Sequence, residues 1–439
     1  MSKDNKHDEI DWYSDFIDRQ YSPAEDELIA LYHFDKAKEM TVDDVIGRLA
    51  SESSIGTWTK LETLDDRIFG MRGRSFENTD SLVKISYPLI LWEMNNIPQL
   101  MSGIAGNIFG MKAVKNLRLI DASLPLDYVN SFKGPNMGTE DIQRIFKKKE
   151  GPLTACVPKP KIGMTVEQHC QVAWDAWTGG IDLVKDDENL TSQSFNRFET
   201  RVEEMAKMRD KAEKETGDIK DALINVTAET HEMEKRAKLI HDHGFRYFMI
   251  DVVTTGFSGV QTLRNTAGDL DMAMHAHRAM HASFTKHYDH GISMYFLAKL
   301  MRLIGVDNIH IGTVVGKLDS PKQDVVDMKD LLLKNEVSEA EGRKLNQNWG
   351  NNIKGTLPVA SGGLHPGVLP EVLNVYNTTD MILQVGGGVH GHPDSTHAGA
   401  KATVQAIDAW REGISLEEKA ESSSELAKAL KKWGNLQPI

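Results

Sequence analysis

The residues with the clearest potential for chemistry form the run Lys185-Asp186-Asp187-Glu188. This run closes IDLVK, a segment typical of a short buried strand whose last residue is Lys185. In extended chain Lys185 and Asp187 point the same way, and Glu188 can turn back where the strand ends. Carboxylate oxygens suit a hard cation such as Mg²⁺. A lysine suits such a site only if its amine reacts with carbon dioxide to give an anionic carbamate. The alternative is a solvated charge run in a surface loop.

A second candidate group is Lys159-Pro160-Lys161, which follows the apolar run 153–158. Two lysines on either side of a stiff proline could direct two cations into one site. A desolvated lysine beside another cation has a lowered pKa and can transfer protons. A surface turn with two solvated lysines is equally compatible with this spacing.

Histidines mark the ends of two further apolar runs. His275, His277 and Arg278 close the run 272–277, and His310 lies in the run 308–312. Arginine is well suited to bidentate binding of phosphate. A zinc site is an alternative, but the sequence has no cysteine cluster and no HExxH helix. Any one of these histidines could also be a hydrogen-bonded core residue.

The segment GTVVGKL after His310 contains another lysine, Lys317. Gly312 and Gly316 bracket the loop, which could hinge and carry Lys317 over a bound substrate. The segment resembles a nucleotide-binding P-loop only superficially. Three residues separate its glycines, and Leu318 stands where the P-loop requires Ser or Thr.

Two glycine-rich runs, 361–363 and 386–388, follow the last two apolar segments. Successive backbone amides at such turns can bind anions. Phosphate sites often lie after the seventh and eighth strands of a barrel. Tight turns without a ligand are the alternative. The candidate phosphate ligands are Ser361, Gly362, Gly363, Gly386 and Gly387.

These candidate residues are positioned by a regular alternation of apolar runs with helical segments. Eight such runs predict a (β/α)₈ TIM barrel, in which functional residues gather at the carboxyl ends of the strands. Helices are expected at 195–215 and 292–305. The eight predicted strands are 153–158, 181–185, 222–228, 246–251, 272–277, 308–312, 356–361 and 381–386.

The segment before the barrel predicts an N-terminal α+β domain of ferredoxin-like type. Strands are expected at 27–34, 56–64 and 81–90, and a helix at 41–50 with Thr41 as its N-cap. A single amphipathic helix is expected at 415–433. The predicted domains are 1–135 (α+β), 136–412 (barrel) and 413–439 (helical extension).

Composition excludes several classes of function. The formal net charge of -13 disfavours a nucleic-acid or anionic-membrane surface. Only two cysteines are present, so a disulfide framework is not expected. The polar N-terminus and the lack of a long apolar stretch predict neither a signal peptide nor a membrane span. We therefore expect a cytoplasmic protein.

From about residue 25 onward the chain resembles ribulose-1,5-bisphosphate carboxylase/oxygenase (RuBisCO) large chains. The segment IHIGTVVGKL is similar to that of archaeal, form III-like members, which work without a small subunit. The resemblance rests on ESSIGTW, GNIFGMKA, KPKIG, GGIDLVKDDEN, HAHRAMHA, IHIGTVVGKL, LPVASGG and LQVGGG, in that order.

The resemblance implies the reaction and its catalytic residues. Ribulose 1,5-bisphosphate would react with carbon dioxide, or with oxygen as a side reaction, and carboxylation would give two 3-phosphoglycerates. Lys185, carbamylated by activator carbon dioxide, would bind Mg²⁺ with Asp187 and Glu188. Lys159 would act as the acid/base lysine, and Lys317 would position carbon dioxide.

The resemblance also implies the substrate-binding residues and a homodimer, or a higher oligomer of dimers, with shared active sites. The pathway implied is salvage of AMP. Lys161 would support Lys159, and His277 would take part in proton transfer. Phosphate would bind Arg278, His310, Ser361 and the glycine turns. The residues expected to act from a second subunit are Glu52, Thr57, Trp58 and Asn107.

The sequence departs from the family at Val157, where threonine is common, and at Ile311, where plant-type chains have a small polar residue. One alternative is a RuBisCO-like enolase acting on a thiomethyl sugar phosphate. Another is a non-catalytic sugar-phosphate-binding assembly protein. RuBisCO-like enolases usually lose several of the carboxylation residues, whereas Glu52, Asn107, Lys159, Lys161, Lys185, Lys317 and Ser361 are all present here. An assembly protein would not need the lysine–carboxylate run together with Lys317.

Overall fold

The computed structural model describes residues 12–148, 151–315 and 321–434. Its contacts divide the chain into two compact units. The first consists of Met1–Lys133, Met280–Leu303 and Lys334–Ile353, and the second consists of the remaining residues. The linear domain ranges expected from the sequence stay predictions, since these units are discontinuous.

The first unit is built on a mixed sheet with the strand order β10-β4-β1-β3-β2. Strand β1 pairs antiparallel with both β3 and β4, and β10 pairs parallel with β4. The strands expected at 27–34 and 81–90 are confirmed as β1 and β3. The bounds are β1 (Leu28–Lys36), β2 (Arg74–Asn78), β3 (Leu82–Tyr87), β4 (Val114–Ser123) and β10 (Gly291–Ile292).

Helix α2 (Val42–Glu52) begins where the sequence predicts. The Thr41 side chain accepts from the backbone amide of Asp44, and the Asp44 side chain accepts from the backbone amide of Thr41. This reciprocal capping box satisfies two donors that a helix start leaves open. The expected N-cap is therefore confirmed.

The strand expected at 56–64 is wrong. The segment is an irregular loop, with Trp58 69% exposed. Its start is held by local bonds: the Gly56 amide donates to the Ser51 carbonyl, and the Trp12 indole donates to the Thr57 carbonyl. Alternation of polar and apolar residues predicts a strand only where a neighbouring strand pairs with it, and here none does.

The second unit contains eight parallel strands in the order β7-β6-β5-β15-β14-β11-β9-β8. The ends of this order meet through a parallel bridge between Asn225 and Met249, so the sheet forms a nearly closed barrel. All eight predicted strands are confirmed. Their bounds are β5 (Leu153–Cys156), β6 (Leu183–Lys185), β7 (Asp221–Leu223), β8 (Tyr247–Asp251), β9 (Ala273–His277), β11 (Asn308–His310), β14 (Leu357–Ser361) and β15 (Ile382–Val385).

The barrel interior is filled by apolar side chains from most of its strands. Leu183, Tyr247, Val359 and Ile382 belong to one buried cluster, to which helix α6 (Gly138–Phe146) adds Phe146. Every residue of β8 is buried. Strands covered on both faces are continuous apolar runs rather than alternating ones, and for this reason short apolar runs located the barrel strands.

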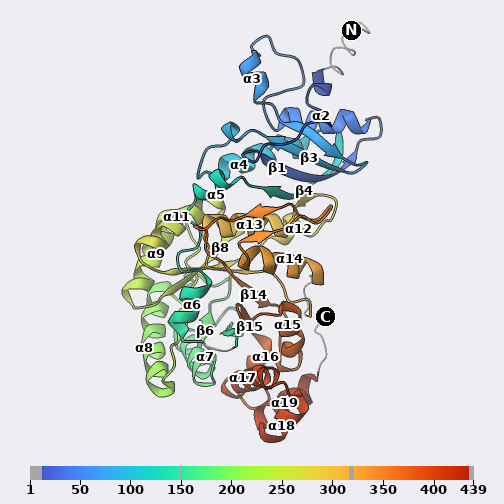
Figure 1. Cartoon of the computed structure of the whole chain (residues 1–439). Coiled ribbons are helices and arrows are strands. Elements are labelled where there is room, and N and C mark those ends of the chain that lie inside the picture. The colour runs from blue at the N-terminus through green and yellow to red at the C-terminus, as the bar shows by residue number, and fades with distance from the viewer. Residues whose placement is uncertain (1–11, 149–150, 316–320, 435–439) are drawn as a thin grey trace. The chain divides into compact units, whose positions relative to one another are not determined.

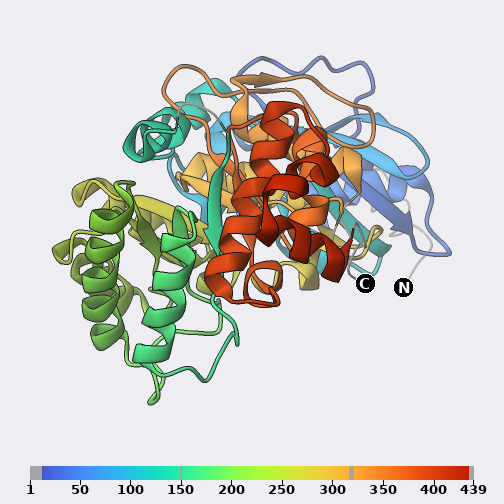
Figure 2. The same cartoon turned by 90° about the horizontal axis from the view of Figure 1, so that it is seen from below.

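Helices surround the barrel strands, and α7 and α8 lie side by side in both views (Figures 1 and 2). The helix predicted at 195–215 is confirmed as α8. The helices of this unit include α7 (Val166–Thr178), α8 (Phe198–Thr216), α9 (Thr230–Asp242), α10 (Val252–Thr255), α11 (Phe257–Asp269), α14 (Lys322–Leu333), η3 (Pro366–Val368), α15 (Leu369–Tyr376), α16 (Gly387–His390) and α17 (Thr396–Glu412).

The single helix expected at 415–433 is wrong, because two helices occupy this range. They are α18 (Leu416–Ser422) and α19 (Ser424–Trp433), which gather with α17 (Figure 1). Ser423 separates them with φ -127° and ψ 90°, which is outside the helical region. Polar periodicity continues across this break, so the sequence pattern does not reveal it.

The remaining elements are short or belong to the first unit. The predicted helix at 292–305 is confirmed as α13. The bounds are α3 (Asp66–Gly70), η1 (Leu89–Leu91), α4 (Ile97–Ile104), η2 (Asn107–Gly110), α5 (Leu126–Asn130), α12 (Ala282–Thr285), α13 (Met294–Ile304), β12 (Glu336–Val337) and β13 (Gln347–Asn348).

Cys156 and Cys170 are both buried free thiols, as expected. Among the described helices, none combines the length and the apolar character that a bilayer crossing requires.

Candidate active site

Lys185 is the last residue of β6, and its side chain is fully buried in the barrel. Its Nζ donates to the Asp186 carbonyl oxygen at 2.7 Å and lies 3.9 Å from Glu188 Oε2. Burial lowers the pKa of Lys185, although Glu188 and Asp251 oppose this. The neutral amine, the form that reacts with carbon dioxide, is thereby favoured. Burial is the largest cause of this shift.

Asp187 and Lys159 join the first two strand ends. Lys159 Nζ donates to Asp187 Oδ2 at 2.9 Å. Burial alone would raise the pKa of Asp187, but hydrogen bonds from Asn189 and Lys159 lower it. Asp187 is therefore an ionised carboxylate at neutral pH. Lys161 is exposed in the same loop as Lys159.

The donor set at this strand end is two carboxylates and one buried amine. Carboxylates are ligands that Mg²⁺ prefers, and a carbamate on Lys185 would add a third anionic oxygen donor. These residues therefore fit magnesium once Lys185 is carbamylated. Among the described residues, no cluster of three or more His, Cys, Asp or Glu side chains is arranged to hold a metal ion.

His277 ends β9 beside the carboxylates. Its Nδ1 donates to Asp251 Oδ1 at 2.7 Å, and its Nε2 lies 3.7 Å from Glu188 Oε2. The bond to Asp251 fixes the orientation of the ring and directs Nε2 toward the carboxylate group of the site. Asp251 is the last residue of β8.

A buried hydrogen-bonded chain leads from the barrel interior to Ser361. His275 Nε2 lies 2.9 Å from His310 Nε2, and His310 Nδ1 lies 2.6 Å from the Ser361 hydroxyl. His275 also bonds Asn308, whose side-chain amide donates to the Tyr247 hydroxyl at 3.3 Å. Burial holds the pKa values of His275 and His310 well below the usual range, so both rings are neutral at pH 7.

Arg278 follows β9 and is 8% exposed. Burial lowers its pKa to about 10, and the nearby Tyr376 raises it. Arg278 therefore keeps its positive charge at neutral pH in a partly desolvated position, where a bound phosphate would interact with it strongly.

The two glycine runs form sharp turns after β14 and β15. Gly362 and Gly363 have φ values of 117° and 72°, the left-handed region that favours glycine. A Cβ on Gly386 would lie 3.4 Å from Lys159 Cε, so this turn lies close to the lysine loop. Helix α16 starts at Gly387, and the first amides of a helix have no intrahelical partner.

Four further predicted residues belong to the first unit. Glu52 ends α2, Asn107 starts the neighbouring η2, and Thr57 and Trp58 lie in the irregular loop, all in the first unit. Lys317 lies outside the described residues, as does Gly316.

Sequence reasoning missed three residues that support the site: Asp251, Asn308 and Arg201. Asp251 could have been found, because it ends a predicted strand as Lys185 does. Asn308 starts a strand and Arg201 lies in a helix, and their importance depends on side-chain hydrogen bonds that no spacing reveals.

Comparison with known families and relatives gives a consistent result. Residues 138–433 match the family described as ribulose bisphosphate carboxylase large chain, catalytic domain, and residues 15–128 match the N-terminal domain of that large chain. The chain is 49% identical over 433 residues to the ribulose bisphosphate carboxylase of Pyrococcus furiosus, across 98% of this chain and 99% of the relative. It is also 47% identical over 430 residues to the ribulose bisphosphate carboxylase of Methanocaldococcus jannaschii, across 95% of this chain and 100% of the relative.

Solved structures agree with these matches. A dimeric archaeal Rubisco from Hyperthermus butylicus superposes with a TM-score of 0.92 at 45% identity, across 97% of this chain and 100% of the other. An octameric Rubisco from Pyrococcus horikoshii gives a TM-score of 0.89 at 47% identity, across 96% of this chain and 97% of the other.

Proposed function

The chain belongs to the RuBisCO large-chain family, and from this premise we propose that it is a magnesium-dependent ribulose 1,5-bisphosphate carboxylase. One observation carries the proposal: Lys159, Lys185, Asp187, Glu188 and His277 converge at the carboxyl ends of the barrel strands β5, β6 and β9. Barrel enzymes place their catalytic groups at these carboxyl ends of the strands.

Carbamylated Lys185, Asp187 and Glu188 would hold the metal. When bound, Mg²⁺ would stabilise negative charge on the substrate oxygens. Burial lowers the pKa of Lys185, which raises the fraction of neutral amine and supports carbamylation. Carbon dioxide therefore has two roles in this proposal, as activator and as substrate.

Lys159 would move protons at the substrate carbons, and its Nζ already lies against the carboxylate group of the site. Removing the proton beside the substrate carbonyl gives an enediolate, which attacks carbon dioxide or, as a side reaction, oxygen. Hydration and carbon–carbon cleavage then give two 3-phosphoglycerates. His277, oriented by Asp251, would take part in proton transfer, and Lys317 would position carbon dioxide.

The substrate phosphates would bind at two regions of the barrel mouth. Arg278, His310 and Ser361 would contact one phosphate, and the glycine turns would contact the other through backbone amides. The buried positive charge of Arg278 supports the first assignment. The residues proposed for the turns are Gly362, Gly363, Gly386 and Gly387, with Lys161 supporting Lys159.

We further propose a homodimer with shared active sites and no small subunit. Glu52, Thr57, Trp58 and Asn107 would act on the barrel of a second chain. The archaeal relatives support self-assembly, since one is described as dimeric and another as octameric. Mixing inactive Glu52→Gln and Lys159→Ala chains under proven subunit exchange should restore activity, because one site in each mixed dimer is free of both changes.

The proposed pathway is salvage of AMP in the cytoplasm, supported by the similarity to archaeal relatives. Cell extract supplied with AMP and phosphate should then form ribulose 1,5-bisphosphate and consume it by way of this protein. Extract depleted of the protein should accumulate the bisphosphate instead.

A labelling assay tests the carboxylase itself. Purified protein with labelled bicarbonate, Mg²⁺ and ribulose 1,5-bisphosphate should give acid-stable label in 3-phosphoglycerate. Chelation of the metal should abolish the label. Absence of label from folded, preactivated protein would refute the proposal.

A further inference from the structure

The second residue of the metal-site run, Asp186, has no place in the mechanism above. In extended chain its side chain points opposite to those of Lys185 and Asp187. It is buried and ionised, and it has partners from three directions. Its Oδ2 accepts from Arg201 Nε at 3.1 Å and from the Asn225 amide at 3.0 Å, and His169 Nε2 lies 3.2 Å from Oδ1.

Arg201 lies in the first turns of α8 and is fully buried. Besides Asp186, it donates through Nη2 to the Thr191 carbonyl at 2.7 Å. Its Nη1 donates to the Asn196 carbonyl at 3.2 Å and to Asn196 Oδ1 at 3.0 Å. The planar guanidinium thus holds the whole loop that follows β6, from Asp186 to Asn196.

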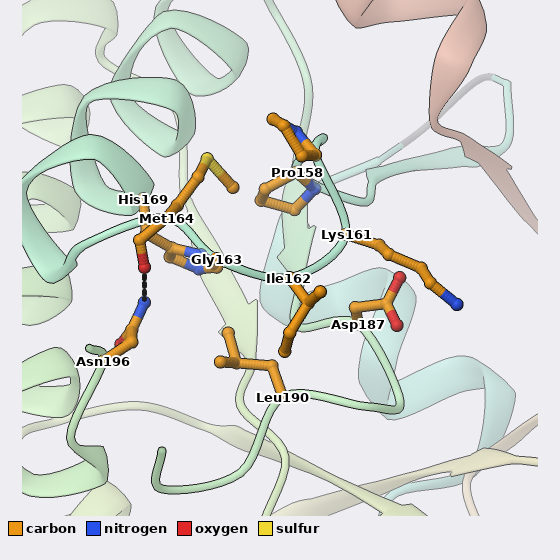
Figure 3. A pocket seen from close by; sticks show the side chains of 10 residues that line it. Pro158, Lys161, Ile162, Gly163, Met164, His169, Asp187, Leu190 and Asn196 are labelled. Carbon is orange, nitrogen blue, oxygen red and sulfur yellow. Dashed lines mark hydrogen bonds between the residues drawn. The ribbon is translucent and has the colours of Figure 1, made fainter. Parts of the chain in front are cut away.

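Asn196 extends this network to the other lysine-bearing loop. Its side-chain amide donates to the Met164 carbonyl at 3.2 Å, a bond drawn in Figure 3. Met164 closes the loop that starts after β5 and contains Lys159 and Lys161. One arginine is therefore linked both to the metal-site strand end and, through Asn196, to the catalytic-lysine loop.

The two loops also line one pocket together (Figure 3). Its lining includes Pro160, Ile162 and Met164 from the first loop and Asp187 and Leu190 from the second.

We propose that Arg201 is a positioning residue that, with Asp186 and Asn196, sets the relative placement of the metal-binding strand end and the Lys159 loop. The inference rests on the proposed function, since it assumes that Lys185 and Lys159 act together on one substrate. Its chemical basis is the five-donor guanidinium, whose fork geometry a lysine ammonium cannot reproduce.

The first test is Arg201→Lys, measured in three ways on the full-length protein. We expect carbon dioxide retention on Lys185 to require about tenfold more Mg²⁺. Exchange of the substrate C3 proton with solvent and carboxylation should both fall about 100-fold, while KM for the bisphosphate changes less than about threefold. Arg209→Lys is the matched control, because Arg209 is also buried in α8 but bonds Asp210 and the His243 carbonyl.

The second test, Asn196→Ala, removes the bond to the Lys159 loop and one bond from Arg201, but it leaves Arg201 bonded to Asp186, the Thr191 carbonyl and the residue 196 carbonyl. Proton exchange should fall about tenfold, whereas the Mg²⁺ dependence of carbon dioxide retention should match that of the wild type. This variant decides the matter if Arg201→Lys does not fold. Unchanged proton exchange in folded Asn196→Ala would overturn the inference.

Other outcomes separate the inference from the proposed function. An active wild type with equally active Arg201→Lys would overturn the inference alone. Equal losses in Arg201→Lys and Arg209→Lys would do the same, because they would indicate a general effect on α8. A folded wild type that neither retains carbon dioxide nor carboxylates would refute the proposed function and this inference with it.

Discussion

The two ends of the barrel both contain buried carboxylates, but their partners differ. Asp182, Asp221 and Asp307 stand at the amino ends of strands. All three accept hydrogen bonds from backbone amides, and Asp307 accepts from three of them. Asp182 and Asp221 also have side-chain partners, which are Thr154 and Lys148 for Asp182 and Arg246 for Asp221. At the carboxyl ends, Asp187 and Asp251 are bonded by the side chains of lysine and histidine.

The difference separates stability from chemistry. Backbone partners are fixed by the fold, so a carboxylate bonded to them is tied to one arrangement. Side-chain partners can move or change protonation, so a carboxylate bonded to them can exchange its partner for a metal or a substrate. We therefore expect substitutions at the carboxyl ends to affect activity and those at the amino ends to affect stability.

The largest expected effect comes from comparing two buried lysines, Lys185 and Lys220, at opposite ends of the barrel. Lys185→Arg cannot form a carbamate and should lose carboxylation by about 1000-fold or more, since the metal site loses an anionic ligand. Lys220, also 0% exposed, donates to the Ile181 carbonyl at the opposite end of the barrel. Lys220→Arg should keep its activity per folded molecule within about twofold.

Labelled product formation after preincubation with bicarbonate and Mg²⁺ measures both variants. Preincubation should raise the initial rate of the wild type and of Lys220→Arg, but not that of Lys185→Arg. Wild-type carboxylation by Lys185→Arg would show that the proposed metal site is wrong. A similar loss in folded Lys220→Arg would remove the distinction between the two ends.

A second pair compares carboxylates. Asp187→Asn should lower kcat about 100-fold and change the melting temperature little, because the side chains of Lys159 and Asn189 donate most of its hydrogen bonds. In Asp307→Asn, the new side-chain NH₂ group would face backbone amides that donate to Asp307 in the wild type. This conflict between donors should lower the unfolding free energy by on the order of 2–4 kcal/mol.

Denaturant unfolding and carboxylation rates, measured on the same preparations, test this pair. The rate per folded molecule of Asp307→Asn should match the wild type. If Asp187→Asn instead lost stability with unchanged activity, the roles assigned to the two ends would be reversed.

The carboxyl-end residues were predictable because periodicity located the strand ends. Lys185, His277, His310 and Ser361 are each the last residue of a barrel strand. The amino-end carboxylates gave no such signal, since an aspartate before an apolar run is common at exposed turns as well.

What the sequence could not give depends on tertiary partners. The range 56–64 alternates like a strand but lies outside every sheet. Arg201 looks like an ordinary charged residue of a polar helix until its hydrogen bonds to the β6–α8 loop are known. Local patterns specify elements, whereas loop networks depend on segments that only the fold brings together.

The smallest expected effect is a pH dependence that has opposite signs at the two ends. Burial raises the pKa of Asp221 from 3.8 to about 6, although Arg246 and the Ala222 amide oppose this. The folded protein therefore binds more protons than the unfolded chain between these values. The contribution of Asp221 to stability is complete below about pH 3.8. It is lost as pH rises through about 6, and the loss is on the order of 1–3 kcal/mol.

Asp186 provides the matched control. Burial would raise its pKa, but Arg201 and His169 lower it from 3.8 to about 2. The stabilisation that Asp186 contributes is therefore complete above about pH 3.8 and is lost only as pH falls toward 2.

Melting temperatures at about pH 4.5 and about pH 7 should separate the effects of the two carboxylates. Relative to wild type, Asp221→Asn should gain stability as pH rises across this window, because it removes a carboxylate that is costly to ionise. The difference between Asp186→Asn and wild type should stay constant across the same window. A constant difference for Asp221→Asn would mean that its backbone bonds already favour the ionised form, and the amino end would then match the carboxyl end in its response to pH.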